Sequence, residues 1–330
     1  MKRLITTIIV LLGVLGFAFV SEHQAQTAQQ KRPVVGVLQT LSHPALDQIR
    51  EGIIAGLKSE GYVDGKNVVL DVENAQGDQS NLKSMADKFM NKNARVTVGI
   101  ATPAVQALAN QTTATPVVMG GISDPLGTGL VKSLQHPGGK VTGTKEQEPV
   151  AQQVAMIRAI MPNLKTIGVL HTSSDDSSTA EYQEFRKLME AHGVTVKSFT
   201  ITSTNDISQT AETMVRQVEA VYVPTDNTVA SGIMTLAKAV DGAKIPLFPA
   251  VATMMKPAGV ATISSSQFDM GVVTGKMVAR VLRGEKPATM AVEQTKKVDT
   301  TINLKQARKL GLTIPQRYVD AAEKRGEIIQ

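Results

Sequence analysis

The 330-residue chain contains no cysteine and no tryptophan, and aromatic residues make up only 3% of it. Without cysteine it has no disulfide framework, no thiolate metal site, no cysteine nucleophile and no cysteine that could carry a lipid. Four of the five histidines lack an i, i+3 or i, i+4 partner of the kind found in metal sites, and the fifth, His43, is better placed to touch a ligand. We therefore expect neither a metal nor a cofactor.

Common catalytic motifs are also missing. The sequence has no GxSxG nucleophile elbow, no HExxH pair and no acidic pair spaced for general acid and base catalysis. The glycines of Gly120-Gly121 and Gly127-Thr128-Gly129 fit neither GxGxxG nor a P-loop and are interpreted as turn glycines. We predict that the protein is not an enzyme. A cell-surface α/β hydrolase stays open as the alternative, because distant residues can also assemble a triad.

The chain begins with an export signal. Met1-Lys2-Arg3 precedes the apolar run Leu4–Val20, which is the pattern of a charged n-region and an h-region. Only weak cleavage positions follow, and the apolar run would form a helix of about 25 Å, at the short end of what crosses a bilayer. We expect an exported protein at the outer membrane face, either anchored by an uncleaved Leu4–Val20 or released after cleavage. Residues 1–30 are the signal peptide or anchor.

Short β-branched runs alternate with helical patterns from Pro33 onward. The predicted strands are Val34–Leu38, Val68–Glu73, Val96–Ile100, Pro116–Met119, Thr166–Leu170, Thr195–Thr200, Ala220–Val223 and Ile245–Phe248. The predicted helices are Pro44–Gly61, Asn81–Asn91, Pro103–Gln111, Ala151–Met161, Ala180–Gly193, Ile207–Gln217 and Ala230–Gly242. The alternation predicts an α/β fold with doubly wound parallel sheets. The net charge of +6 is scattered over these helices, so we expect no nucleic-acid partner.

A weak internal repeat indicates two similar lobes. Val35–Thr40 (VGVLQT) aligns with Ile167–Thr172 (IGVLHT), and Gly61 aligns with Gly193 at the same offset. We also predict that Phe268–Leu282 is a helix that returns to the first lobe, so that several hinge strands join the lobes. The predicted boundaries are residues 31–145 plus 255–285 for the first lobe and 146–254 plus 286–330 for the second.

Small hydroxyl, amide and acidic residues follow most predicted strands and come directly before a helix. Any one of them is most simply a helix cap; Thr102 and Asp124 are predicted N-caps, and His43 takes the same position before Pro44. Together, however, these loops converge on one edge of two facing sheets. N–H groups and hydroxyls there could hold a carboxylate, and Asp226 or Asp124 could pair with an ammonium. The pattern indicates a zwitterionic ligand.

Five short segments carry a family resemblance through their order and spacing. They are Thr40–Asp47 (TLSHPALD), Ala101–Ala104 (ATPA), Ser123–Pro125 (SDP), Pro224–Thr228 (PTDNT) and Asn303–Pro315 (NLKQARKLGLTIP). The chain resembles the tryptophan-binding and related substrate-binding proteins of ABC importers, over about residues 33–323. It departs from many of these proteins in lacking a lipobox cysteine, which puts a lipid anchor in doubt but not ligand binding.

The resemblance implies a type I periplasmic-binding-protein fold, in which two lobes joined by three hinge crossovers close on an amino acid. Tryptophan or another aromatic amino acid is the favoured ligand, and another small solute is the alternative. The implied partners are an ABC permease and, through it, its ATPase, and we expect a monomer. The ligand-binding residues carried over by position are Ser42, His43, Thr102, Ser123, Asp124, Thr172, Ser173, Asp226 and Asn227, with Ser265 near a hinge.

Overall fold

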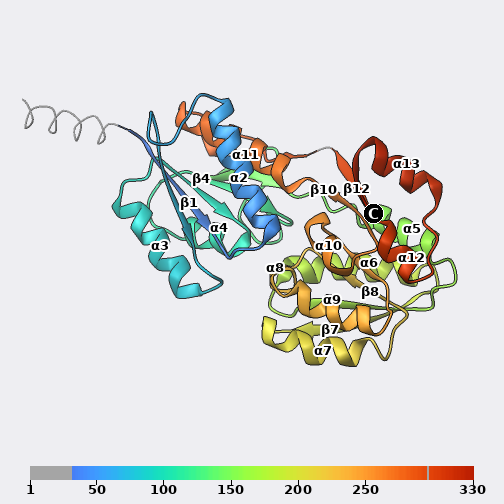
Figure 1. Cartoon of the computed structure of the whole chain (residues 1–330). Coiled ribbons are helices and arrows are strands. Elements are labelled where there is room, and N and C mark those ends of the chain that lie inside the picture. Colours follow the sequence, from blue (N-terminus) through green and yellow to red (C-terminus); the bar gives the residue numbers. More distant parts are fainter. Residues whose placement is uncertain (1–31, 296) are drawn as a thin grey trace, which may run out of the picture.

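The computed structural model describes residues 32–295 and 297–330, so the predicted export segment lies outside the described residues. Figure 1 shows two lobes beside each other, with the blue and cyan part of the chain in one and the green and yellow part in the other. Each lobe is built on a parallel sheet with helices on both faces. This confirms the predicted α/β class and the two doubly wound sheets.

The first lobe contains a six-stranded parallel sheet in the order β11-β5-β4-β3-β1-β2. Helices α2 and α11 share one apolar cluster with one face of this sheet, and α3 and α4 share another cluster with the opposite face. The strands are β1 (Val34–Gln39), β2 (Val69–Asn74), β3 (Val96–Ile100), β4 (Val117–Ile122), β5 (Val141–Lys145) and β11 (Glu293–Gln294). The helices are α2 (Pro44–Ser59), α3 (Gln79–Asn91), α4 (Thr102–Ala109) and α11 (Gln267–Leu282).

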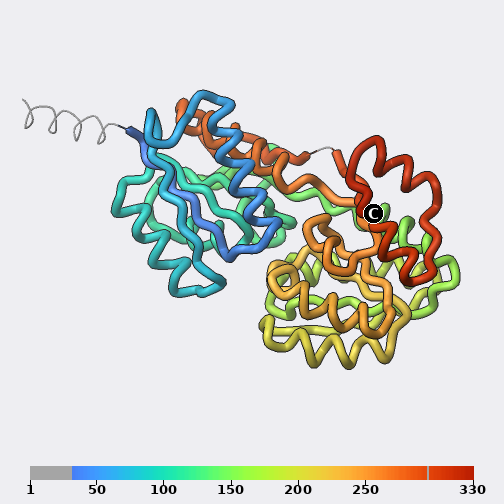
Figure 2. Tube along the Cα trace, viewed as in Figure 1, coloured from blue at the N-terminus to red at the C-terminus, as the bar shows by residue number. Residues whose placement is uncertain are grey.

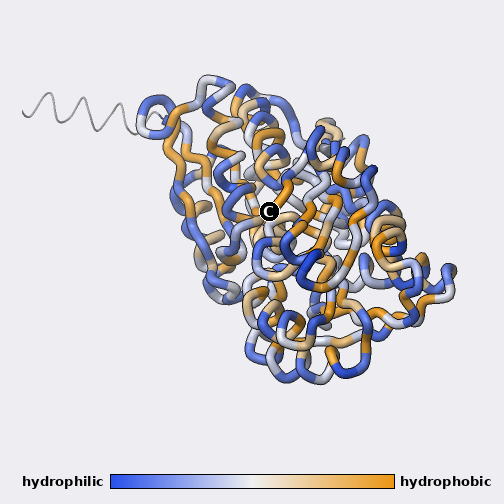
Figure 3. Tube along the Cα trace, turned by 45° about the vertical axis from the view of Figure 1, so that its right-hand side comes forward, coloured by the Kyte–Doolittle hydropathy of each residue, from blue (hydrophilic) through white to orange (hydrophobic). Residues whose placement is uncertain are grey.

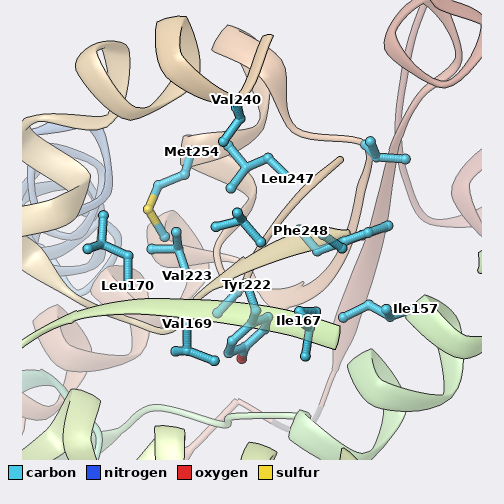
Figure 4. Packing of buried hydrophobic residues seen from close by; sticks show 14 of the residues in the cluster. Ile157, Ile167, Val169, Leu170, Tyr222, Val223, Val240, Leu247, Phe248 and Met254 are labelled. Atoms are coloured by element: carbon cyan, nitrogen blue, oxygen red, sulfur yellow. The ribbon is translucent and has the colours of Figure 1, made fainter. Parts of the chain in front are cut away.

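The second lobe contains a four-stranded parallel sheet in the order β7-β6-β8-β9 and a three-stranded sheet in the order β10-β12-β13. Figure 4 shows the packing of its buried apolar residues. The strands are β6 (Thr166–Thr172), β7 (Thr195–Ile201), β8 (Ala220–Val223), β9 (Leu247–Pro249), β10 (Ala261–Ser265), β12 (Val298–Asn303) and β13 (Gly326–Ile329). The helices are α5 (Val150–Ile160), α6 (Asp176–Glu190), α7 (Ile207–Met214), α8 (Asn227–Ser231), α9 (Ile233–Gly242), α10 (Met255–Ala258), α12 (Leu304–Lys309) and α13 (Gln316–Lys324).

The internal repeat corresponds to equivalent strands. β1 and β6 each lie second from one edge of their sheets, and each pairs in parallel with the next strand of the chain. Two local predictions were wrong. Val141–Lys145, where no strand was predicted, forms β5, and the single helix predicted over Ala230–Gly242 is divided at Gly232 into α8 and α9. A Cβ at Gly232 would lie 2.4 Å from the Ile207 side chain at the start of α7, whose terminal methyl group would have to shift.

The chain crosses between the lobes three times, as predicted: between β5 and α5, between β10 and α11, and between β11 and β12. The predicted boundaries at residues 255 and 285 differ from these crossings. Ala258 and Ile263 are buried in the apolar core of the second lobe. Glu293 and Gln294 instead pair with β5 in the first lobe, so this lobe extends to residue 294.

The contact between α2 and α11 depends on glycine. Figure 2 shows α11, in orange, running along the blue α2 although the two are far apart in the sequence. A Cβ at Gly52 would lie 2.2 Å from the Phe268 carbonyl oxygen, and one at Gly275 would lie 2.2 Å from the Ile53 carbonyl oxygen. The helix backbones therefore touch directly, which ties the segment after the second crossover to the start of the first lobe.

Hydropathy is divided between the interior and the loops. In Figure 3 hydrophobic segments run along the inner strands and helix faces, and hydrophilic ones gather at loops and outer helix edges. No helix within residues 32–295 and 297–330 has the length and apolar character needed to cross a membrane.

Candidate functional site

A cavity lies between the lobes, at the carboxyl ends of both parallel sheets, where ligands of doubly wound sheets bind. Its volume is about 340 Å³, at the small end of the range of roughly 300–1,000 Å³ for small-molecule sites. The first lobe lines it with the segments after β1, β3 and β4, and the second lobe with those after β6, β8 and β9. A ligand in this cavity therefore contacts both lobes at once.

Most of the predicted site residues lie in this cavity. The predicted residues that line it are His43, Thr102, Ser123, Thr172, Asp226 and Asn227. The structure places Ser42, Asp124, Ser173 and Ser265 outside its lining. Their side chains are bonded elsewhere: Ser42 donates to Asp47, Asp124 accepts from the Gly127 N–H, Ser173 donates to the Ile201 carbonyl, and Ser265 donates to the Gln147 carbonyl.

The predicted helix caps have three different outcomes. His43 is the N-cap of α2, as predicted, and its Nδ1 accepts from the Ala45 N–H at 3.3 Å. Thr102 is the first residue of α4, and Ala101 takes the cap position instead. Asp124 caps no helix, because the chain turns back at Gly127 and bonds that N–H to the Asp124 carboxylate at 2.8 Å.

Asp226 holds two loops of the second lobe together. It is buried, and it caps α8 by accepting from the Val229 N–H at 2.9 Å. Its carboxylate also accepts from the N–H of Thr172 at 2.6 Å and from the Thr172 hydroxyl at 2.8 Å. Both carboxylate oxygens thus have protein donors, and Asp226 fixes the loop after β6 against the loop after β8.

Asp175 is a cavity residue that was not predicted. It is the N-cap of α6, and its Oδ1 accepts from the N–H groups of Ser177 and Ser178 at 3.0 and 3.1 Å. Burial, together with the nearby charge of Asp226, raises the pKa of Asp175 to about 6. The predicted helix began only at Ala180, and this late start hid the cap. The second-lobe wall therefore carries Asp175 and Asp226 as neighbouring carboxylates, and Asp176 also belongs to the cavity lining.

The first-lobe wall has the opposite polarity. The start of α4 lies at the cavity, and its N-cap residue, Ala101, makes no side-chain hydrogen bond to it. The Thr40 hydroxyl beside it accepts from the Ala104 N–H at 3.2 Å and donates to the Ile100 carbonyl at 3.0 Å. The start of α2 is capped by an imidazole rather than by a carboxylate. Helix N-termini carry partial positive charge, and neither of these two is neutralised by an acidic cap.

His43 and Asn227 connect the two walls. His43 Nε2 lies 3.0 Å from Asn227 Oδ1, across the cavity between the lobes. Because Nδ1 accepts from Ala45, the proton of the neutral ring is on Nε2, so His43 donates and Asn227 accepts. Burial lowers the pKa of His43, although the bond to Asn227 opposes the shift, and the neutral ring is favoured.

Comparisons with known proteins identify the family. A family model described as ABC transporter substrate binding protein matches residues 34–325. The chain is an ABC transporter substrate-binding protein. This confirms the predicted family, whose members act outside the cytoplasm. It also agrees with the type I periplasmic-binding-protein fold seen in the two sheets and three crossovers.

Three relatives are informative for this substrate-binding protein. It is similar to the ABC domain from Streptococcus pneumoniae in complex with L-Trp, with 42% identity, a TM-score of 0.87, and coverage of 91% of this chain and 100% of that one. It is also similar to a ligand-free, open substrate-binding protein from Clostridium difficile, with 30% identity, a TM-score of 0.70, and coverage of 90% and 99%. A tyrosine-binding protein of Clostridioides difficile is 28% identical over 92% of this chain and 90% of its own length.

The rest of the cavity lining is aliphatic and polar. The aliphatic side chains come from both lobes, and no aromatic residue of the described chain lines the cavity. They are Leu41, Leu46, Ile49, Val251 and Met254, together with Ala45, Ala101 and Ala230. Thr253 was also not predicted, and its buried hydroxyl has no partner within the described residues, which leaves it available to a ligand.

Glu146 joins the cavity to the hinge. It is buried in the first crossover, where its carboxylate accepts from Gln267 Nε2 at 2.7 Å and its carbonyl accepts from Gln294 Nε2 at 3.2 Å. Gln267 follows the second crossover and Gln294 precedes the third, so Glu146 bonds to all three crossing segments. Burial, with a contribution from the charge of Glu148, raises the pKa of Glu146 to about 7. Such long-range bonds leave no local sequence signal.

Proposed function

We propose that this protein binds one free amino acid between its lobes and closes around it. The observation that carries the proposal is the opposite polarity of the two walls. Asp175 and Asp226 form an acidic wall on the second lobe, and the first lobe presents the N-terminus of α4, which has no acidic cap. An ammonium is stabilised at the acidic wall of the second lobe and a carboxylate at the helix N-terminus of the first lobe, and a free amino acid carries both groups.

The favoured ligand is an aromatic amino acid, tryptophan above others. Support comes from the L-Trp complex and the tyrosine-binding relative. The aliphatic side chains of Leu46, Ile49 and Met254 offer an apolar surface to such a ring. Burying apolar surface contributes roughly 25 cal/mol per Å². A cavity of about 340 Å³ suits a single residue rather than a peptide.

Closure follows from contacts that exist only when the lobes meet. The ligand binds one lobe first and gains the contacts of the second lobe on closing, so its differential affinity shifts the population to the closed form. The bond between His43 and Asn227 belongs to that closed form.

The closed protein would deliver its ligand to an ABC permease, driven by the associated ATPase, and would act there as a monomer. We place it at the outer face of the membrane, held by an uncleaved Leu4–Val20 or released after cleavage. N-terminal sequencing of the protein recovered from cells tests the choice. A mature chain that begins near residue 30 would exclude the anchor.

We further propose that the protein returns its ligand unchanged and needs no cofactor. The alternative hydrolase would need a serine and a histidine oriented by a third group. His171 Nε2 lies 3.0 Å from the Ser198 hydroxyl, but His171 Nδ1 has no partner in the part of the chain that the structure describes. Neither residue lines the cavity. Chromatography of the ligand after incubation tests this: a new product would contradict it.

Calorimetry with matched analogues tests the ligand class. L-tryptophan is compared with tryptophanamide, which lacks the carboxylate, and with indole-3-propionate, which lacks the ammonium. We expect each analogue to lose about 1.5–3 kcal/mol of binding free energy, the value of a charge-assisted hydrogen bond. Sugars and nucleosides serve as controls for another small solute. Equal binding of all three indole compounds, or no binding among all twenty amino acids, would overturn the proposal.

A further inference from the structure

A chain of buried polar side chains lies behind the cavity, inside the second lobe. It consists of Gln153 on α5, Tyr222 on β8 and Glu181 on α6, and all three residues are buried. Figure 4 shows Tyr222 among the apolar residues of the core, near Ile167 and Val169. Polar groups are costly in such surroundings unless each hydrogen bond has both a donor and an acceptor.

The donors and acceptors of these hydrogen bonds follow from the position of Gln153. Its Nε2 lies 3.1 Å from the Ala250 carbonyl oxygen and 2.8 Å from the Ile263 carbonyl oxygen. Carbonyl oxygens only accept, so the amide NH2 must face them and Oε1 must accept. Tyr222 Oη lies 2.7 Å from that Oε1. The single hydroxyl proton of Tyr222 is therefore donated to Gln153.

Glu181 must then supply the next proton. Tyr222 Oη also lies 2.5 Å from Glu181 Oε1, and two oxygens at this distance share a proton. Since the tyrosine proton is already used, the shared proton belongs to the carboxyl group of Glu181. The other oxygen, Oε2, accepts from the Thr225 N–H at 2.8 Å. Every bond of the chain is satisfied when Glu181 is neutral, and one is not when it is ionised.

The surroundings of Glu181 agree with this proton count. Burial, with the charge of Glu148, raises the pKa of Glu181 well above its usual value, although hydrogen bonding with Tyr222 and Thr225 opposes the shift. Burial likewise raises the pKa of Glu148, whose charged neighbours are Lys145, Glu184 and Asp124. The salt bridges of residues 32–295 and 297–330 include none to Glu181.

We propose that Glu181 is held as a neutral carboxylic acid and positions the ligand-binding loops of the second lobe. The hydrogen bonds of Gln153 and Glu181 reach three backbone positions that matter for ligand binding. Thr225 precedes Asp226 in the cavity wall, and Ala250 precedes the cavity segment that contains Thr253. Ile263 lies in β10, which leads into the second crossover. Glu181 is thus a positioning residue that touches no ligand.

Glu181→Gln carries the test, because a glutamine amide can donate to Tyr222 and accept from Thr225 as the neutral acid does. We expect this variant to bind the amino acid within about twofold of the wild type near neutral pH. Glu181→Ala, which leaves the hydroxyl and the N–H unpaired, should lose at least about fivefold in affinity. Glu212→Gln, at an exposed position on α7, is the control.

The binding test rests on the proposed function, because it needs an amino-acid ligand. Two further measurements need no ligand, so they test the state of Glu181 even if the proposed function is wrong. The infrared spectrum should contain a buried protonated-carboxyl band that disappears in Glu181→Gln and persists in Glu212→Gln. A raised pKa gives the wild type its full stability below the usual glutamate pKa, and stability is lost as pH rises toward the folded-state value. Glu181→Gln does not titrate, so its stability relative to the wild type should rise with pH. An unchanged infrared band, or a Glu181→Gln variant as impaired as Glu181→Ala, would overturn the inference.

Discussion

The bond between His43 and Asn227 should contribute directly to ligand affinity, because it forms only when the lobes meet. It is a neutral hydrogen bond of 3.0 Å in a partly buried place, worth about 0.5–1.5 kcal/mol net. Asn227→Ala should therefore weaken binding by roughly two- to tenfold through this bond alone. His43→Ala removes the same bond and also the cap of α2, which costs about 0.5–2 kcal/mol of folding free energy.

A double-mutant cycle separates the energy of the bond between His43 and Asn227 from the energy of direct ligand contacts. Calorimetric Kd values for the wild type, both single variants and the double variant should give a coupling energy of about 0.5–1.5 kcal/mol. Stopped-flow measurements should show the loss mainly as faster dissociation, since the closed form opens more readily. His192→Ala, at an exposed residue outside the cavity, should bind as the wild type does. Losses that add within about 0.3 kcal/mol would refute a direct bond in the closed form.

Three further predictions follow from single contacts. Gly275→Ala should lower the free energy of unfolding by about 1–3 kcal/mol in chemical denaturation, because its Cβ would lie 2.2 Å from the Ile53 carbonyl oxygen. Gly242→Ala, whose Cβ meets no atom within 4 Å, should be neutral or stabilising by up to about 1 kcal/mol, and equal losses in both variants would contradict the packing argument. The wild-type free energy of unfolding should fall as pH rises through the Glu146 pKa of about 7. In Glu146→Gln the plot of unfolding free energy against pH should be flatter over this range. Parallel plots for the two proteins would exclude Glu146 as the cause. Asp175→Asn should lose about 1.5–3 kcal/mol of amino-acid affinity in calorimetry, and an unchanged Kd would show that the ammonium binds elsewhere.

Patterns that repeat along the chain were enough to predict the scaffold. The segments around Val35–Thr40 and Ile167–Thr172 became equivalent strands, because buried parallel strands need the same run of apolar residues in each lobe. β11 was missed, since a strand of two residues shows no period. Its pairing with β5 depends on residues about 150 positions earlier in the chain.

The site was predicted less completely than the fold, for a physical reason. A proline after a small polar residue looks the same at Thr102 and at Asp124, yet only the first begins a helix. The difference at Asp124 arises from the turn that Gly127 closes. Glu146 and Glu181 act through bonds to distant segments, and no spacing in the sequence reveals such partners.

The direct backbone contact between α2 and α11 has a consequence for how the newly made chain behaves. α2 leaves the ribosome early, whereas the glycine face of α11 that covers it and the edge strand β11 are synthesised only after most of the second lobe. Domains generally fold as units during synthesis. Here the amino-terminal lobe stays incomplete until nearly the end of translation. We expect this delay to keep the precursor unfolded while it is threaded through the export channel.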